Sequence, residues 1–187
     1  MTNIWIRSAT FPNAYLRMDG SNVTSFNGLG SGTVNCQYYG PGSQPQAQTG
    51  NDEVLFLVPL SDPTAFAIRS TLLLTANAYL RMDGSEVTQF NVNGSGTVNC
   101  QYYATGTKPQ VAAGNDEVFR LVSIPNSPVF AIRSISYPNA YLRLSGSAVT
   151  QHTGAGSGSV NCQYYAPGTQ PQWTAGNFET FYISGVQ

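Results

Sequence analysis

Acidic side chains recur at matching positions in this chain, next to amides and aromatic rings. Asp19 in the stretch "YLRMDGS" returns as Asp83 in an identical stretch. Asp52 in "GNDEV" returns in the same way as Asp116. Planar amides and carboxylates form hydrogen bonds with vicinal hydroxyl groups, and an aromatic face covers the apolar C–H patch of a sugar ring. The chemistry that this mixture favours is the binding of a carbohydrate.

Residues for catalysis do not recur in the same way. Enzymes need a group that titrates near neutrality or an activated nucleophile. His152 is the only histidine, and it takes the position of Phe26 and Phe90 in the related stretches, so it is interpreted as a replacement for an aromatic residue. Neither a repeated Ser–His or Cys–His arrangement nor a glycosidase-like carboxylate pair occurs. We therefore expect a protein that is not an enzyme and that has no cofactor.

The hexapeptide "VNCQYY" occurs three times and places one cysteine in each copy: Cys36, Cys100 and Cys162. Side chains alternate between the two faces of a strand, so the valine, the cysteine and the first tyrosine share the more apolar face. Three equivalent thiols cannot all pair. We expect three buried, reduced cysteines that act as small apolar residues. A three-thiolate metal site on a threefold axis is the alternative.

The hexapeptide belongs to a repeat that covers the whole chain. Ile-Arg-Ser, Asn-Ala-Tyr-Leu-Arg, Gly-Ser-Gly, Pro-Gln and Gly-Asn each occur three times in the same order. Cys100 lies 64 residues after Cys36, and Cys162 lies 62 residues after Cys100; the difference is interpreted as an insertion in "STLLLTAN". A period of this length is typical of a supersecondary unit. The sequence predicts one domain over residues 1–187, with repeats at 1–64, 65–128 and 129–187.

Each repeat has the pattern of four strands. Aromatic and β-branched residues alternate between Gly and Pro, and helix signals are absent. Leu16 and Met18 share one face of the second strand, and hydrophobic residues alternate in the same way along residues 53–58. Repeated glycines such as Gly20, Gly84 and Gly146 are expected at turns with positive φ. Three repeats of four strands predict an all-β chain with the β-trefoil fold, because a propeller normally needs at least four blades.

The order "IRS … NAYL … VNCQ … G-N-(D/F)-E-x-F" resembles the fascin-like and agglutinin branch of the β-trefoils. In that branch each repeat has a Tyr-Leu pair on its second strand and Glu-x-Phe near its last. Glu117-Val118-Phe119 and Glu179-Thr180-Phe181 match the second motif, and Leu55 replaces the phenylalanine in the first repeat. The Gln-x-Trp signature of ricin-type trefoils is absent. The resemblance implies a β-trefoil of the lectin or agglutinin kind.

Arginine and glutamate also repeat. Six of the eight basic residues belong to the two repeated arginine positions, represented in the first repeat by Arg7 and Arg17. Glu53 and its counterparts share a strand face with core positions. Because a carboxylate in such a place needs a partner, we expect one structural Arg–Glu pair in each repeat.

The candidate binding residues are the polar and aromatic side chains expected on the outer face and in the loops. In repeat three, Ser145 and Phe178 replace both aspartates, so its site is expected to bind weakly or differently. The predicted carbohydrate-binding residues are Asp19, Asn35, Gln37, Tyr39, Gln46, Asn51, Asp52, Asp83, Asn99, Gln101, Tyr103, Gln110, Asn115, Asp116, Asn161, Gln163, Tyr165, Gln172 and Asn177.

The amino-acid composition excludes some classes of binding partner. Charged residues make up 9% of the chain and the formal net charge is -1, so no basic surface for nucleic acid is expected. No apolar run is long enough to span a bilayer, and residues 1–15 lack the pattern of a signal peptide. We expect a cytoplasmic protein, with release by a non-signal route left open.

Expected partners are glycans or glycoproteins, bound at up to three linked sites that gain avidity. The alternatives are a protein-binding β-trefoil, either a fascin-like cross-linker or a protease inhibitor, and a structural or storage protein. The sugar and the oligomeric state are left open by the sequence.

Overall fold

The structure is a computed structural model that describes residues 3–48, 50–71 and 77–186. These residues form twelve strands and no helix, and none of them belongs to a helix that could cross a membrane. The all-β prediction is confirmed. The insertion in "STLLLTAN" falls mostly outside the described residues. The strands are β1 (Asn3–Ser8), β2 (Ala14–Asp19), β3 (Thr33–Tyr38), β4 (Leu55–Pro59), β5 (Phe66–Ser70), β6 (Asn77–Asp83), β7 (Gly96–Tyr103), β8 (Phe119–Ser123), β9 (Phe130–Ser134), β10 (Ala140–Ser145), β11 (Gly158–Tyr164) and β12 (Phe181–Gly185).

Six strands close into a ring through antiparallel pairs. Within each repeat the first strand pairs with the last, as β1 with β4, β5 with β8 and β9 with β12. Between repeats the last strand pairs with the first of the next, as β4 with β5, β8 with β9 and β12 with β1. The final pairing joins the two ends of the chain, so the ring has no free edge strand.

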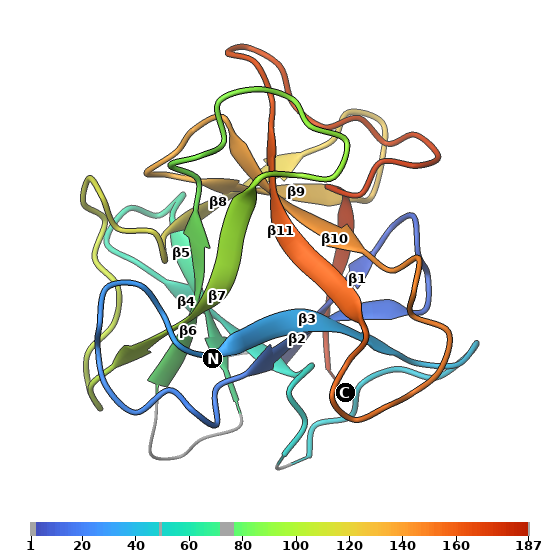
Figure 1. Cartoon of the computed structure of the whole chain (residues 1–187), viewed down its shortest axis with the longest axis horizontal. Coiled ribbons are helices and arrows are strands. Elements are labelled where there is room, and N and C mark those ends of the chain that lie inside the picture. The colour runs from blue at the N-terminus through green and yellow to red at the C-terminus, as the bar shows by residue number, and fades with distance from the viewer. Residues whose placement is uncertain (1–2, 49, 72–76, 187) are drawn as a thin grey trace.

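The other six strands form three hairpins: β2–β3, β6–β7 and β10–β11. Their registers are equivalent, since Leu16 faces Cys36, Leu80 faces Cys100 and Leu142 faces Cys162. Figure 1 shows β3, β7 and β11 as a triangle around the middle of the molecule, with the connecting loops at its periphery. The same hairpin pairing therefore occurs three times.

The hydrophobic core lies inside the ring and beneath the hairpins. Leu16 and Met18 are fully buried, as the strand pattern predicts. Leu55, Phe119 and Phe181 occupy equivalent buried positions on the last strand of each repeat. One contiguous cluster includes all of these side chains, so the three repeats share one main core, beside two smaller clusters around Tyr79 and Tyr141.

The repeated cysteines lie where the three hairpins meet. All three thiols are free and buried, as predicted. Cys162 on β11 pairs with Gly96 on β7, and a Cβ atom at residue 96 would lie 2.6 Å from the Cys162 sulfur. Burial raises the pKa of the Cys36 thiol to about 12. The triplicated Cys and Gly-Ser-Gly motifs therefore have one explanation: small residues let neighbouring hairpins approach each other.

The prediction of positive φ at Gly20, Gly84 and Gly146 is wrong. None of the three is among the described glycines with positive φ. A Cβ atom on Gly84 would lie 2.8 Å from the Cβ atoms of both Ala140 and Tyr137 in the next repeat. This turn needs glycine because of close packing, not because of its backbone conformation.

Candidate functional site

Each hairpin carries an arginine whose guanidinium is buried beside at least one acidic side chain. In repeat two, Arg81 Nη2 lies 3.1 Å from Asp83 Oδ2 and 2.7 Å from Asp116 Oδ2, and Arg81 Nε lies 4.0 Å from Glu117 Oε1. The predicted Arg–Glu pair is present in all three repeats. The equivalent distances are 3.3, 2.5 and 3.6 Å from Arg17 to Asp19, Asp52 and Glu53, and 3.5 Å from Arg143 to Glu179.

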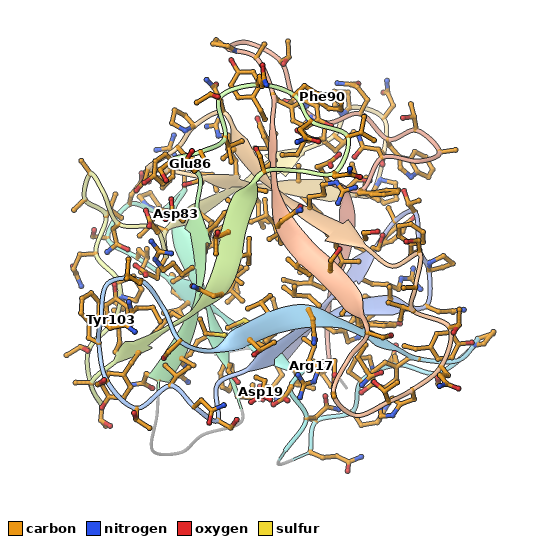
Figure 2. The ribbon with its side chains drawn as sticks, in the orientation of Figure 1. Arg17, Asp19, Asp83, Glu86, Phe90 and Tyr103 are labelled. Atoms are coloured by element: carbon orange, nitrogen blue, oxygen red, sulfur yellow. The ribbon has the colours of Figure 1, made fainter. Side chains whose placement is uncertain are left out.

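These clusters carry more negative than positive charge in repeats one and two. Three ionised carboxylates around one guanidinium leave an excess of two negative charges. Burial raises the pKa of Asp52 to about 6, although Arg17 opposes the shift. The hydrogen bond from Ser21 holds the pKa of Asp19 below its usual value, because this aspartate also caps a turn. Figure 2 shows Arg17 and Asp19 side by side.

A tyrosine and an asparagine extend each cluster toward the surface. The Tyr39 hydroxyl donates to Glu53 Oε2 at 3.1 Å, and Asn51 Nδ2 donates to the Tyr39 oxygen at 3.4 Å. Burial and the Glu53 carboxylate raise the pKa of Tyr39. The Tyr–Glu contact recurs at 3.0 Å between Tyr103 and Glu117 and between Tyr165 and Glu179.

The neighbouring repeat adds an aromatic ring to each of these tyrosines. The ring centroids of Phe26 and Tyr103 lie 5.6 Å apart, with the rings edge to face. His152 packs in the same way against Tyr39, at 5.5 Å. Phe26 is 61% exposed although it touches Tyr103. His152 therefore takes the structural place of an aromatic residue, as predicted.

Two small cavities open at these contacts, and we call them the boundary hollows. The hollow of repeat one, about 230 Å³, contains the predicted residues Tyr39, Asn51 and Asp52. The hollow of repeat two, about 300 Å³, contains Tyr103, Asn115 and Asp116. His152 and Gly154 complete the first hollow, and Phe26 and Gly28 complete the second. Each hollow thus combines two repeats.

Gln37, Gln101 and Gln163 lie on the outer face of their strands, as expected, but the expectation that they are open to a ligand is wrong. Gln37 is 0% exposed, and its side-chain oxygen accepts hydrogen bonds from the backbone N–H groups of Tyr38 and Thr153. A loop of the neighbouring repeat covers the outer face of each of these strands. The glutamines hold that loop and lie outside the hollows: Gln101 binds Asn27, and Gln163 binds Asn91.

The remaining predicted amides also bind loop backbone. Asn35 Nδ2 donates to the carbonyl of Ala155 at 2.8 Å. Gln46 is exposed, and its amide donates to the carbonyl of Gln44 within its own loop. Neither residue lines a boundary hollow. The equivalent contacts are those of Asn99 with Leu29, Asn161 with Asn93, Gln110 with Lys108 and Gln172 with Gln170.

Repeat three replaces the aspartates with an aromatic contact. The Arg143 guanidinium carbon lies 4.7 Å from the centre of the Phe178 ring, which also packs against Phe11. Ser145 forms a hydrogen bond with Ser147 instead of an ion pair. Because both aspartates of repeat two bind one atom of Arg81, their loss together in repeat three follows from a shared arginine.

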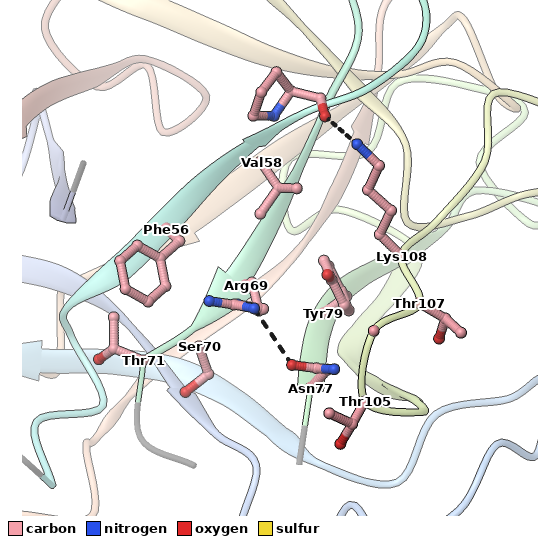
Figure 3. Close-up of a pocket in the computed structure, with 12 residues that line it drawn as sticks. Phe56, Val58, Arg69, Ser70, Thr71, Asn77, Tyr79, Thr105, Thr107 and Lys108 are labelled. Atoms are coloured by element: carbon pink, nitrogen blue, oxygen red, sulfur yellow. Dashed lines mark hydrogen bonds between the residues drawn. The ribbon is translucent and has the colours of Figure 1, made fainter. Parts of the chain in front are cut away.

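A cavity of about 660 Å³ lies beside the first strands of repeat two, and we call it the Arg69 groove (Figure 3). Arg69 on β5 is paired with Tyr79 on β6. None of its residues is among the predicted ones. The sequence signal that could have identified this groove is the repetition of its arginine in Ile-Arg-Ser and of its asparagine and tyrosine in Asn-Ala-Tyr. The groove is lined by Phe56, Val58, Pro59, Arg69, Ser70, Thr71, Asn77, Tyr79, Thr105, Gly106, Thr107 and Lys108.

A related cavity of about 510 Å³ lies in repeat three, where Arg133, Asn139 and Tyr141 take the places of Arg69, Asn77 and Tyr79. Within residues 3–48, 50–71 and 77–186, no three His, Cys, Asp or Glu side chains are grouped so that they could hold a metal ion.

Comparison with known proteins finds similarity to solved structures only. No family model matches the sequence, and no curated protein matches it either. A mosquitocidal holotoxin superposes with a TM-score of 0.57 and 11% identity over 100% of this chain and 17% of the toxin. A Polyporus squamosus lectin, bound to the epitope Neu5Acα2-6Galβ1-4GlcNAc, superposes with a TM-score of 0.56 and 13% identity. This match covers 98% of the chain and 49% of the lectin.

A salivary protein of Culex quinquefasciatus, from a cysteine- and tryptophan-rich family, gives a TM-score of 0.50 and 14% identity over 98% of this chain and 93% of that protein. The chain thus spans less than half of the toxin and of the lectin. At these identities the likeness is one of fold.

Proposed function

We propose that this chain is a carbohydrate-binding protein, a lectin that holds neutral sugars in its boundary hollows. One observation carries the proposal. An exposed aromatic ring from one repeat faces a tyrosine, an amide and carboxylates of the next, and this arrangement occurs at two boundaries.

The fold that we propose is a single β-trefoil domain built from the three sequence repeats. The closed ring of six strands and the three hairpins in equivalent register support this fold. Linked sites on one rigid domain would act together on a glycoprotein that bears several sugars, as an agglutinin does.

The second hollow offers complementary chemistry to a hexose. The Phe26 ring is free to cover the C–H face of the sugar, because more than half of its surface is exposed. Asn115 and the carboxylate of Asp116 would form hydrogen bonds with vicinal hydroxyl groups. We propose binding without catalysis, since Arg81 and Tyr103 engage the neighbouring carboxylates in structural contacts.

Repeat three would bind differently. Its boundary places Phe90 against Tyr165, with ring centroids 6.2 Å apart, and Phe178 stands in place of the aspartate. An aromatic contact remains there without that charged acceptor. Two stronger sites and a weaker third are therefore expected.

A glycan array followed by calorimetry tests the proposal. Phe26→Ala should weaken the second site about tenfold, because the stacking surface is lost. Leu29→Ala is the matched control: Leu29 is 71% exposed on the same loop but does not line the hollow. A folded protein that binds no glycan, or equal losses from the two variants, would refute the proposal.

A protein-binding β-trefoil is the second candidate, favoured by apolar side chains on the loops. Phe26, Leu29, Phe90, Val92 and Trp173 are all at least half exposed. Co-sedimentation with filaments and protease inhibition assays would test it. Under this function Leu29→Ala should matter as much as Phe26→Ala.

A further inference from the structure

The Arg69 groove differs from the boundary hollows in its charge. Two of the chain's eight basic residues, Arg69 and Lys108, line it, and none of its lining residues is acidic. The hollows have the opposite character, with Asp52 and Glu53 in the first. The ligand that suits the groove is therefore an anion, while the hollows suit neutral sugars.

The lysine contributes a charge without a carboxylate partner among the described residues. Lys108 is exposed, and its ammonium donates to the carbonyl of Pro59 at 2.8 Å. Asp62, three residues beyond that carbonyl, is paired with Arg120 at 3.0 Å. A bound anion would thus meet an ammonium that no carboxylate of the described residues neutralises.

The arginine is held in place by its neighbours. Arg69 Nη1 donates to Asn77 Oδ1 at 3.4 Å, and its guanidinium carbon lies 4.8 Å from the centre of the Phe56 ring. Figure 3 shows the guanidinium between Phe56 and Asn77, with Lys108 extending to the other wall. A planar guanidinium fixed in this way matches a carboxylate better than a flexible cation does.

The rest of the groove suits a sugar ring. The half-buried Phe56 provides aromatic surface, and the exposed Thr105 provides a hydroxyl group. A cavity of about 660 Å³ is larger than a bare carboxylate or sulfate needs. We propose that the Arg69 groove binds an acidic sugar, with its carboxylate between Arg69 and Lys108 and its ring along Phe56.

The chain itself offers the matched variant. Gln44 and Gln170 hold the position of Lys108 in the other repeats. The Gln170 amide donates to the carbonyl of Ser123 at 3.2 Å, which is the counterpart of the Lys108–Pro59 contact. Lys108→Gln therefore removes the charge and keeps the backbone hydrogen bond.

Calorimetry with glucuronate, glucose and acetate tests the proposal. Wild-type protein should bind glucuronate about ten times more tightly than glucose or acetate, and added salt should weaken the binding. Lys108→Gln should weaken glucuronate binding about tenfold and leave glucose binding unchanged. Gln170→Lys should strengthen glucuronate binding in repeat three, beside Arg133.

Equal binding of glucuronate and glucose would overturn the proposal, and so would an unchanged affinity in Lys108→Gln. If acetate binds as tightly as glucuronate, the groove is a simple anion site, and the proposal that it recognises a sugar ring is overturned. Sulfated glucose that replaces glucuronate at equal affinity would overturn the choice of carboxylate. Phe26→Ala should not affect glucuronate, so this result is independent of the boundary hollows.

Discussion

The Arg81 and Arg143 clusters each neutralise a buried guanidinium, but with different neighbouring side chains. Both arginines are about 5% exposed and lie at equivalent positions on their hairpins. Arg81 is surrounded by three carboxylates, whereas Arg143 has Glu179 and the face of Phe178. A buried guanidinium can thus be satisfied by several acids or by one acid and one aromatic ring.

Comparing the two clusters distinguishes residues that stabilise the fold from residues that could bind a ligand. The Arg–Glu–Tyr contacts are common to both clusters and hold the last strand against the hairpin. The aspartates differ between them, so they are dispensable for the fold once an aromatic ring covers the arginine. Of the two aspartates in repeat two, Asp116 lines a hollow, and it is therefore the one that can serve both structure and a ligand.

Replacing the glutamate that both clusters contain should change the stability more than any other substitution. The loss should be much larger in repeat three than in repeat two. Glu179→Gln leaves Arg143 without a carboxylate among the described residues, so we expect a loss of about 3 kcal/mol in the free energy of unfolding. Glu117→Gln leaves two aspartates on Arg81, so less than about 1 kcal/mol is expected. Urea denaturation measures both.

Glu86→Gln is the control for these variants. Glu86 is exposed, so a change within about 0.5 kcal/mol is expected. Equal losses from Glu179→Gln and Glu117→Gln would contradict the division of charge described above.

Converting one cluster into the other should show strong coupling. Asp116→Ala removes the 2.7 Å ion pair of Arg81 and should cost about 2 kcal/mol. The double variant Asp83→Ser with Asp116→Phe recreates repeat three, and it should lie within about 1 kcal/mol of the wild type. Tyr137 holds the position of Phe11, whose ring packs against Phe178 in repeat three, so it would give the new ring an aromatic neighbour. A double variant less stable than Asp116→Ala would show that the two clusters are not interchangeable.

Lowering the pH should stabilise the protein slightly through Asp52. Its pKa is about 6 in the folded chain and about 3.9 when unfolded, so the folded state binds more protons between these values. The free energy of unfolding should therefore fall as the pH rises through 6, by on the order of 1 kcal/mol between pH 5 and pH 7.5. Asp52→Asn should reduce this slope in urea denaturation curves. An unchanged slope would assign the pH dependence to other groups.

Exchanging the ring over the first hollow should have the smallest effect. His152→Phe gives the first hollow the residue that Phe26 supplies to the second, so sugar affinity should rise about two- to threefold. Calorimetry at pH 7.5 measures the change, with the exposed neighbour Gln151→Ala as the control. A loss of affinity would indicate that His152 itself binds the sugar.

The sequence by itself determined the all-β class, the twelve strands and the core. Alternation of apolar residues such as Leu16 and Met18 follows directly from strand geometry, so it can be read without tertiary information. The repeated glutamate and arginine also predicted their own pairing, because a charge on a core-facing position requires a partner.

Only the tertiary structure decided which residues share a cavity. Gln37 and Tyr39 lie on the same face of their strand, yet a loop from another repeat buries the glutamine and leaves the tyrosine at a hollow. That loop is more than 100 residues away along the chain. The alternation of side chains along one strand does not show which distant segment packs against that strand. Contacts between repeats, and the sites that they form, therefore become visible only in the folded structure.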